Sequence, residues 1–473
     1  MAKKQDTAPL APVLDVTPPA SMRRAGRLTS LLIAAFLVGL FYLAYVLVSQ
    51  SPEYMAKAGR TGYGIVCDRF GDVLYDGTKP LTAYPAGHFA DVGNLIGDTS
   101  GQMNNTLIAR NLGALANYSF LYGSDGHVTI QTTLSHKANQ AVCKALGSKD
   151  GTVIAYNWKT GELLCCVSKP GLDIAKGYAN IDSMPKGSLL CKAFYPTVPG
   201  STQKVSTLIA AYQACGIEKI NALQFSCKGS FLNAKGQLIK CHKSEGHGTQ
   251  TLSEAFANSC NPYFAQLVQS PMLPLSSVIE TYTQMGYSVN GAAAESFEMD
   301  GIRIAAASTE LLDQNDFDTQ WGCLGQGRTL VSPFQLMLFQ GAIANGTGRA
   351  VMPHLVDTKT DIDGSVTAWH SGEPQQTGQL FTSEAAKAVQ AVMTENAAKH
   401  YNVSLPAFSC GVKSGTAQVA ADGKEQENSL LAGFCLDADC PVAFCILIEA
   451  RSTNDITTAQ IAKTLLTSLK GVS

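Results

Sequence analysis

An uninterrupted apolar run at residues 28–49 constrains this chain more than any other feature of its sequence. The run reads LTSLLIAAFLVGLFYLAYVLVS and contains no charged residue. About 20 apolar residues are enough for a helix that crosses a bilayer. Arg23, Arg24 and Arg27 stand directly before the run, and basic residues stay on the cytoplasmic side. We therefore expect one membrane-spanning helix, with the N-terminus inside the cell and the chain after Glu53 outside.

A cleaved secretory signal is the alternative to a permanent anchor. Its apolar core would be shorter, roughly 7–15 residues, and a cleavage site between small residues would follow it. Residues 49–52 read Ser-Gln-Ser-Pro, which is a poor cleavage site. An uncleaved anchor is therefore favoured, and residues 1–27 are expected to form a cytoplasmic tail.

The composition of the whole chain is that of a globular protein. Of its 473 residues, 45% are hydrophobic and 15% are charged, which is enough to build a sizeable core over two or three domains. The net charge is −2, so no basic field exists to attract nucleic acid. We exclude nucleic-acid partners on this ground.

The 14 cysteines are numerous for an exported protein, and disulfides can form outside the membrane. Cys227 and Cys241 are too far apart for a zinc knuckle, so no metal site is predicted, and one built on Cys241, His242 and His247 is the less favoured alternative. For Cys227 and Cys241 two interpretations stay open. They form a disulfide around a hairpin that contains Gly229 and Gly236, or they are two buried free thiols.

Strand and helix patterns at the two ends of the outer chain predict its fold class. A helical spacing of apolar residues runs from Leu134 to Leu146, and a β-hairpin follows at 152–167. Three further strands are predicted at 411–419, 430–436 and 442–449, before a closing amphipathic helix for which Asp455 is the expected N-cap.

Joining these ends gives an α+β fold. We expect a five-stranded antiparallel sheet flanked by helices, with an inserted all-helical subdomain of more than 200 residues, and an active site where the insertion meets the sheet edge. The predicted divisions are a tail at 1–27, an anchor at 28–49, a small non-catalytic domain at 50–126 and the main domain at 127–473.

The first motif with catalytic chemistry is at residues 199–204, Pro-Gly-Ser-Thr-Gln-Lys. Pro and Gly interrupt the preceding structure, and apolar residues at helical spacing follow. Ser201 is therefore expected at a helix start, with Lys204 one turn later on the same face. A serine is a weak nucleophile unless a base accepts its proton. A lysine can be that base when burial, a helix N-terminus and a second cation lower its pKa.

The second motif is Ser259-Cys260-Asn261, and Pro262 follows it. The segment before it is helical in character, so the triplet is expected at a helix end or in a loop. A serine hydroxyl in that place can pass a proton, and an asparagine amide can hold a substrate carbonyl. A polar helix terminus without catalytic function is the ordinary alternative.

The third motif, Lys413-Ser414-Gly415-Thr416, lies inside a strand pattern. Gly415 leaves space for another backbone to lie alongside, and the strand amides can then pair with an extended peptide. Lys413 and Thr416 are candidates for holding a carboxylate. The alternative is an ordinary edge strand that carries a lysine.

Together and in this order, the three motifs match the set S-x-x-K, S-x-N and K-[ST]-G of serine acyltransferases. Residues 127–473 thereby resemble the transpeptidase domain of penicillin-binding proteins. Supporting runs lie at 151–155 with 160–164, 198–204, 246–248 with 259–264, 325–327 with 332–333, 344–346 and 413–419. The space between the anchor and this domain is too short for a glycosyltransferase, so the resemblance is to monofunctional class B proteins of the PbpA-like and FtsI-like group. At 64–74 the Arg-Gly pair usual in class B proteins is not conserved in this chain.

The resemblance implies catalytic roles for five residues. Ser201 attacks the penultimate D-alanine carbonyl of a peptidoglycan stem peptide, and Lys204 accepts its proton. Ser259 and Lys413 return the proton to the leaving D-alanine, and Asn261 holds the peptide amide. The backbone N–H groups of Ser201 and of the threonine in the third motif form the oxyanion hole.

Substrate binding is implied for Ser414, Gly415 and Thr416, with Ser414 and Thr416 on the terminal carboxylate. The implied partners are stem peptides, β-lactams, the plasma membrane through one helix and, by resemblance only, a multi-span glycan polymerase. No cofactor and no metal are expected. The competing functions are a serine β-lactamase, in which water is the acceptor, and a non-catalytic scaffold or β-lactam sensor.

Overall fold

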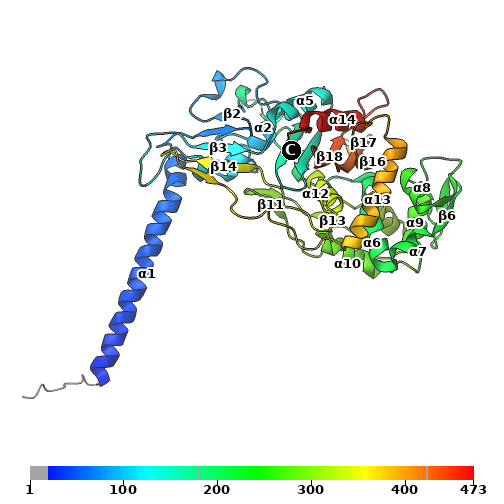
Figure 1. Cartoon of the computed structure of the whole chain (residues 1–473), viewed down its shortest axis with the longest axis horizontal. Helices are drawn as coiled ribbons and strands as arrows, with labels where there is room; N and C mark the ends of the chain where they lie inside the picture. The colour runs from blue at the N-terminus through cyan, green and yellow to red at the C-terminus, as the bar shows by residue number, and fades with distance from the viewer. Residues whose placement is uncertain (1–19, 179–180, 422–423, 473) are drawn as a thin grey trace, which may run out of the picture.

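A computed structural model of the chain describes residues 20–178, 181–421 and 424–472. Its most prominent feature is helix α1, Ala20–Lys57, which projects from the body as an isolated rod (Figure 1). It contains the whole predicted span and passes the length and composition test for a membrane helix. At 1.5 Å per residue its 38 residues extend about 57 Å, which exceeds a hydrocarbon core of about 30 Å. Its last turns reach the body, where Ala56 is buried. Residues 1–19 of the predicted tail lie outside the described residues.

The central sheet has five antiparallel strands in the order β16-β17-β18-β4-β5. Its strands are β16 Cys410–Ala421, β17 Lys424–Cys435, β18 Val442–Ile448, β4 Gly151–Asn157 and β5 Leu163–Lys169. Strands β18 and β4 are buried along their whole length, because they lie between neighbours with helices on both faces. This confirms the sheet predicted from the two ends of the chain and leaves β16 as an edge strand.

The two terminal helices of the domain, α5 His136–Leu146 and α14 Thr458–Leu469, pack together on one face of the sheet (Figure 1). The predicted N-cap of α14 is wrong. Thr457 caps the helix, because its side chain accepts from Gln460 N in a capping box. The Asp455 carboxylate instead accepts from Ser452 and pairs with Lys149.

The other face of the sheet is covered by α12, Pro333–Ala344, in which every residue is buried. A helix that is buried on all sides is expected to be mostly apolar, and two glutamines are the polar side chains of this one. Gly341 permits the close contact with the sheet, since a Cβ there would lie 1.7 Å from Tyr156 Oη. Helix α13, Ser383–His400, packs beside β16 and α6.

The insertion between β5 and β16 contains strands as well as helices, so the prediction of an all-helical insertion is wrong. Its helices, besides α12 and α13, are α6 Lys204–Cys215, α7 Ile217–Asn221, α8 Leu252–Ala257, α9 Asn261–Gln269, α10 Leu275–Gln284 and α11 Phe317–Cys323. Its described residues also form two-stranded ribbons: β6 Gln224–Cys227 with β9 Gly248–Thr251, β7 Ser230–Leu232 with β8 Leu238–Lys240, β10 Tyr287–Val289 with β13 Ala307–Thr309, and β11 Phe297–Met299 with β12 Ile302–Ile304. These strands of three or four residues carry too little pattern to be predicted from sequence.

A second five-stranded sheet, in the order β15-β14-β3-β1-β2, lies next to the membrane helix (Figure 1). It comprises β1 Ile65–Cys67, β2 Val73–Asp76, β3 Thr129–Thr132, β14 Val356–Thr360 and β15 Val366–Ala368. Short helices α2 Gly93–Ile96, α3 Leu107–Arg110 and α4 Leu112–Leu115 accompany it. The sheet combines strands from both sides of residue 126. The predicted domain division at that residue stays a prediction.

Candidate active site

Ser201 lies in a tight turn that leads into a buried helix. A 3₁₀ turn at Gly200–Gln203 runs directly into α6, whose first residue is Lys204. Gly200 has a φ of +55°, and a Cβ there would lie 2.7 Å from Thr416 O. Only glycine fits this approach to strand β16. The turn therefore fixes Ser201 against the edge of the sheet, as the sequence predicts for a helix start.

The amine of Lys204 is the centre of the site. Its Nζ lies 2.9 Å from Ser201 Oγ, 2.7 Å from Ser259 O and 2.7 Å from Asn261 Oδ1. A neutral amine has two N–H groups and one lone pair. The carbonyl of Ser259 and the amide oxygen of Asn261 can accept those two N–H groups, and the lone pair is then left for the Ser201 hydroxyl.

Burial favours this neutral form of the amine. Lys204 is fully buried, and its burial lowers the pKa of the amine to about 7. Lys413 is 1% exposed, and its burial, with the nearby Lys204 charge, lowers its pKa well below the ordinary value. Among the described residues neither lysine forms an ion pair with a carboxylate. No carboxylate therefore offsets the desolvation of the two amines.

The second motif lies between two helices, where α8 ends and α9 begins. Ser259 has a φ of +51°, a strained backbone conformation for a residue other than glycine. Its Oγ lies 3.0 Å from Lys413 Nζ and 3.4 Å from Lys204 Nζ. The hydroxyl therefore bridges the two amines, which is the geometry that a proton relay needs.

Asn261 holds Lys204 in place through one end of its amide. The other end, Nδ2, donates to Lys240 O at 3.1 Å. Both ends are thus engaged within the protein, so the structure adds a positioning role to the predicted contact with a substrate amide, which stays a prediction.

The third motif lies on edge strand β16, directly beside the nucleophile turn. A Cβ at Gly415 would lie 2.8 Å from Pro199 O and 3.1 Å from Ser201 N. The backbone that needs the space at Gly415 is therefore the turn that carries Ser201. Ser414 and Thr416, on either side of Gly415, line the same cleft as Ser201.

This cleft has a volume of about 760 Å³ and lies between β16, the second motif and the β7–β8 hairpin. The fold brings all eight predicted site residues to it or to its wall: Ser201, Lys204, Ser259, Asn261, Lys413, Ser414, Gly415 and Thr416. A buried amine beside a serine hydroxyl, with a second hydroxyl and a second amine behind it, can perform nucleophilic acyl transfer.

Three positions in the site were not assigned from sequence. Gln326 donates to Thr416 O at 2.9 Å and accepts from Gln418 N at 3.3 Å, so it holds the free edge of β16. The Phe264 ring lies 5.5 Å from Lys204 Nζ, and the Phe256 ring lies 5.5 Å from Lys413 Nζ. The run Gly325-Gln-Gly327 was visible as part of the resemblance, but nothing in it indicated a hydrogen bond to β16.

The geometry agrees with a match between residues 151–467 and the model of the penicillin binding protein transpeptidase domain. That match covers more than half of the chain. The chain belongs to this family. One of its relatives is a PbpA transpeptidase, in agreement with the resemblance to the PbpA-like group.

Two curated relatives and one solved structure illustrate the similarity. Stage V sporulation protein D of Bacillus subtilis is 29% identical over 313 residues, which cover 64% of this chain and 45% of that protein. Peptidoglycan D,D-transpeptidase PbpA of Mycolicibacterium smegmatis is 25% identical over 347 residues, 68% of this chain and 67% of that protein. The ceftriaxone acyl-enzyme of penicillin-binding protein A from M. tuberculosis aligns with a TM-score of 0.73 at 18% identity, covering 88% of this chain and 99% of that chain. The chain thus spans less than half of the sporulation protein it matches.

Proposed function

We propose that this chain is a peptidoglycan D,D-transpeptidase that cross-links stem peptides through an acyl-enzyme on Ser201, and that penicillin acylates the same atom. The observation that carries the proposal is the buried Lys204 amine 2.9 Å from Ser201 Oγ. Its lowered pKa, about 7, makes it a base at neutral pH. The M. smegmatis relative is a peptidoglycan D,D-transpeptidase, which supports the same reaction.

In the first half-reaction, Ser201 Oγ attacks the carbonyl carbon of the penultimate D-alanine, and its proton moves to Lys204 Nζ. The C–N bond to the terminal D-alanine then breaks, and the leaving amine takes up a proton. Ser259 is suited to deliver it, because its hydroxyl lies within 3.4 Å of Lys204 Nζ and 3.0 Å of Lys413 Nζ. The proton lost by the nucleophile thus returns to the leaving group.

Strand β16 binds the peptide in this proposal. Apart from the two bonds to Gln326, the outer side of this edge strand has no partner among the described strands and can bind an extended substrate. The N–H groups of Ser201 and Thr416 stabilise the tetrahedral oxyanion, for which one donor is worth about 2.7–4 kcal/mol. Ser414 and Thr416 bind the terminal carboxylate, next to the buried amine of Lys413.

In the second half-reaction, an amine of a second stem peptide attacks the acyl carbon and releases Ser201. Fast attack by water on the acyl-enzyme that penicillin forms would instead make the chain a β-lactamase, and loss of chemistry altogether would leave a scaffold or a sensor. The complete relay of Lys204, Ser259 and Lys413 favours an enzyme over the non-catalytic alternatives.

We place the catalytic body outside the cell, on a single membrane anchor formed by α1. Arg23, Arg24 and Arg27 at the start of this helix support a cytoplasmic N-terminus. A multi-span glycan polymerase in the same membrane is the partner that we propose for this arrangement, on the basis of the family resemblance.

The mass of the full chain in detergent, measured after brief exposure to penicillin and again after hours, tests this function. We expect one adduct with the mass of intact penicillin that persists for hours and that maps to the peptide carrying Ser201. An adduct that disappears within seconds would identify a β-lactamase instead. A complete lack of adduct would favour a scaffold.

Replacing Gly415 by alanine is expected to displace the nucleophile turn. The added Cβ would meet Pro199 O at 2.8 Å and Ser201 N at 3.1 Å, and neither backbone atom can move without shifting Ser201. The free energy of unfolding is expected to fall by about 1–3 kcal/mol, and acylation by penicillin is expected to slow even in the fraction that stays folded. Denaturant unfolding and acylation kinetics measure the two effects.

Gly378→Ala is the matched control, because a Cβ at that position meets nothing within 4 Å. It should change the unfolding free energy by no more than about 0.5 kcal/mol and leave acylation unchanged. Wild-type acylation by the Gly415→Ala variant would show that the close approach of β16 is not needed to position Ser201.

A further inference from the structure

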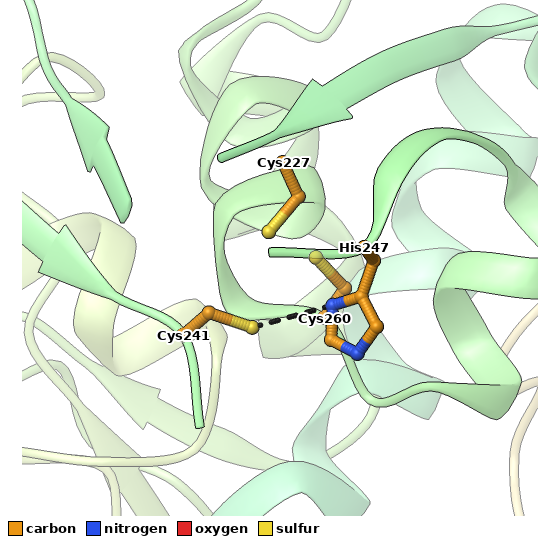
Figure 2. Close-up of side chains that lie close together, drawn as sticks. All are labelled: Cys227, Cys241, His247 and Cys260. Carbon is orange, nitrogen blue, oxygen red and sulfur yellow. Dashed lines mark hydrogen bonds between the residues drawn. The ribbon is translucent and has the colours of Figure 1, made fainter. Parts of the chain in front are cut away.

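Three cysteines and one histidine converge beside the active site, and Figure 2 shows their side chains directed at one another. They come from four separate segments: Cys227 ends β6, Cys241 follows β8, His247 precedes β9 and Cys260 caps α9. All three cysteines are free thiols. The catalytic mechanism uses none of the four side chains.

The distances suit one small ion. The three Sγ atoms and a ring nitrogen of His247 all lie within 4.8 Å of one another, and Cys241 Sγ lies 3.5 Å from His247 Nδ1 (Figure 2). Zinc bonds of about 2.3 Å to sulfur and 2.0–2.1 Å to nitrogen give tetrahedral edges of about 3.8 Å for S···S and 3.6 Å for S···N. No distance between two of the ligand atoms therefore exceeds the corresponding distance in an ideal tetrahedral zinc site by more than about 1.2 Å.

Close backbone approaches build this convergence. His247 N donates to Cys227 O at 3.1 Å, and Cys241 N donates to Gly229 O at 2.9 Å. Two glycines permit the contacts: a Cβ at Gly246 would lie 2.2 Å from Cys227 O, and one at Gly229 would lie 1.8 Å from Ser244 O. Both have a positive φ. The backbone thus holds the segments of Cys227, Cys241 and His247 together independently of any ligand.

The ligand set selects the type of metal. Thiolate sulfur and imidazole nitrogen in a four-coordinate arrangement are typical of zinc, whereas calcium and magnesium require oxygen ligands. Cys227 and Cys260 are buried, and Cys241 and His247 are half-buried. Four protein ligands leave no open position for water, which is the arrangement of a structural site.

We propose that Cys227, Cys241, His247 and Cys260 bind one zinc ion, and that this ion positions the second catalytic motif. The three cysteines bind as thiolates and release their protons to solvent. The expectation of no metal site rested on sequence spacing. This proposal revises it, since the four ligands approach one another only in the folded chain.

The ion would act on catalysis through the neighbours of its ligands. Cys260 lies between Ser259, whose Oγ bridges the two amines, and Asn261, whose Oδ1 lies 2.7 Å from Lys204 Nζ. Asn261 also donates to the carbonyl of Lys240, the residue before the ligand Cys241. Zinc would therefore link the β7–β8 hairpin, which precedes Cys241, to the strained segment at Ser259. It would thereby fix the contacts that Ser259 and Asn261 make with Lys204. The four ligands are positioning residues in this proposal.

Metal analysis of the full chain, purified in detergent under reducing conditions without chelator, tests the site directly. We expect about one equivalent of zinc per chain, and, after replacement by Co²⁺, the intense visible absorption of tetrahedral cobalt with thiolate ligands. The double variant Cys227→Ser/Cys241→Ser should lose the metal, and the control Cys143→Ser, far from the cluster, should keep it. Zinc removal by a chelator should lower the unfolding temperature of the wild type, and added Zn²⁺, but not Mg²⁺, should restore it.

Other outcomes of the metal analysis overturn the site. A Cys227–Cys241 disulfide in peptides mapped without reduction, or a reduced chain that does not bind added Zn²⁺, would exclude it, whatever the chain does with penicillin. The wild-type measurements decide this even if the double variant fails to fold.

The positioning role has its own test. Removal of zinc by a chelator should slow acylation by penicillin, and added Zn²⁺ should restore the rate. The Cys241→His variant, which keeps a zinc ligand, should retain both the metal and the acylation rate. The Cys241→Ser variant should lose both. Bound zinc whose removal leaves acylation unchanged would overturn the positioning role. This part rests on the proposed function, whereas the metal content does not.

Discussion

The Ser201→Ala variant is expected to form no covalent adduct with penicillin. The substitution removes the only atom that the proposed reaction acylates, and it leaves the buried amine of Lys204 without a nucleophile to activate. Its folding should be preserved, because Ser201 is half-buried in a turn that Gly200 and Thr202 maintain. Intact-protein mass after incubation with penicillin measures the result, and thermal unfolding confirms the fold.

Ser276→Ala is the control for Ser201→Ala. Ser276 is exposed on α10 and lies outside the cleft, so this variant should form the adduct at the wild-type rate. A full adduct on the Ser201→Ala variant would mean that another residue is the nucleophile, and Ser259 would then be the first alternative to examine.

Replacing Lys204 by alanine is expected to slow acylation about 10²–10⁴-fold, which is the usual contribution of a general base. The amine is the group nearest to Ser201 Oγ that can accept a proton, at 2.9 Å. Lys204→Met removes the amine but keeps most of the buried volume, so it separates lost chemistry from a cavity. Acylation by penicillin should slow to a similar extent in both variants. Stopped-flow or quenched acylation kinetics provide the measurement.

The pH dependence of acylation gives the same prediction a second readout. A lysine whose pKa is lowered to about 7 is protonated below that pH and neutral above it. The wild-type rate should therefore rise as pH increases through about 7 and then level off, whereas the residual rate of the Lys204 variants should lack this step. Lys463→Ala, on the exposed side of α14, should keep the wild-type profile. A near-normal rate in Lys204→Met would remove this lysine as the base.

Much of the fold was predictable because its signals are local. The apolar run at 28–49 and the strand patterns near the two ends of the outer chain each occupy one continuous segment, and strand and helix periodicities report the burial of such segments directly. The short ribbons of the insertion are too brief to carry a period. The N-cap of α14 was misplaced by two residues, because Asp455 and Thr457 are both suitable caps and only the contacts of Asp455 with Ser452 and Lys149 decide between them.

The residues of the candidate site also divide into those that the sequence predicts and those whose role depends on tertiary contacts. The residue types and their order predicted Ser201, Lys204, Ser259, Asn261 and the segment 413–416, since these types are what acyl transfer needs. The structural role of Gly415, which makes room for the turn of Ser201, follows only from the approach of β16 to that turn. Gln326 was missed because its partners on β16 are about ninety residues away in the chain.

The sequence by itself determined which groups this protein has for its chemistry, and that one helix can anchor it in a membrane. Only the tertiary structure decided what those groups can do. Complete burial, not the identity of Lys204, gives its amine a pKa near 7. Likewise, Cys227, Cys241, His247 and Cys260 form no pattern along the chain, yet their ligand atoms lie within 4.8 Å of one another. Both properties depend on distances between segments that are remote in sequence, and only folding sets those distances.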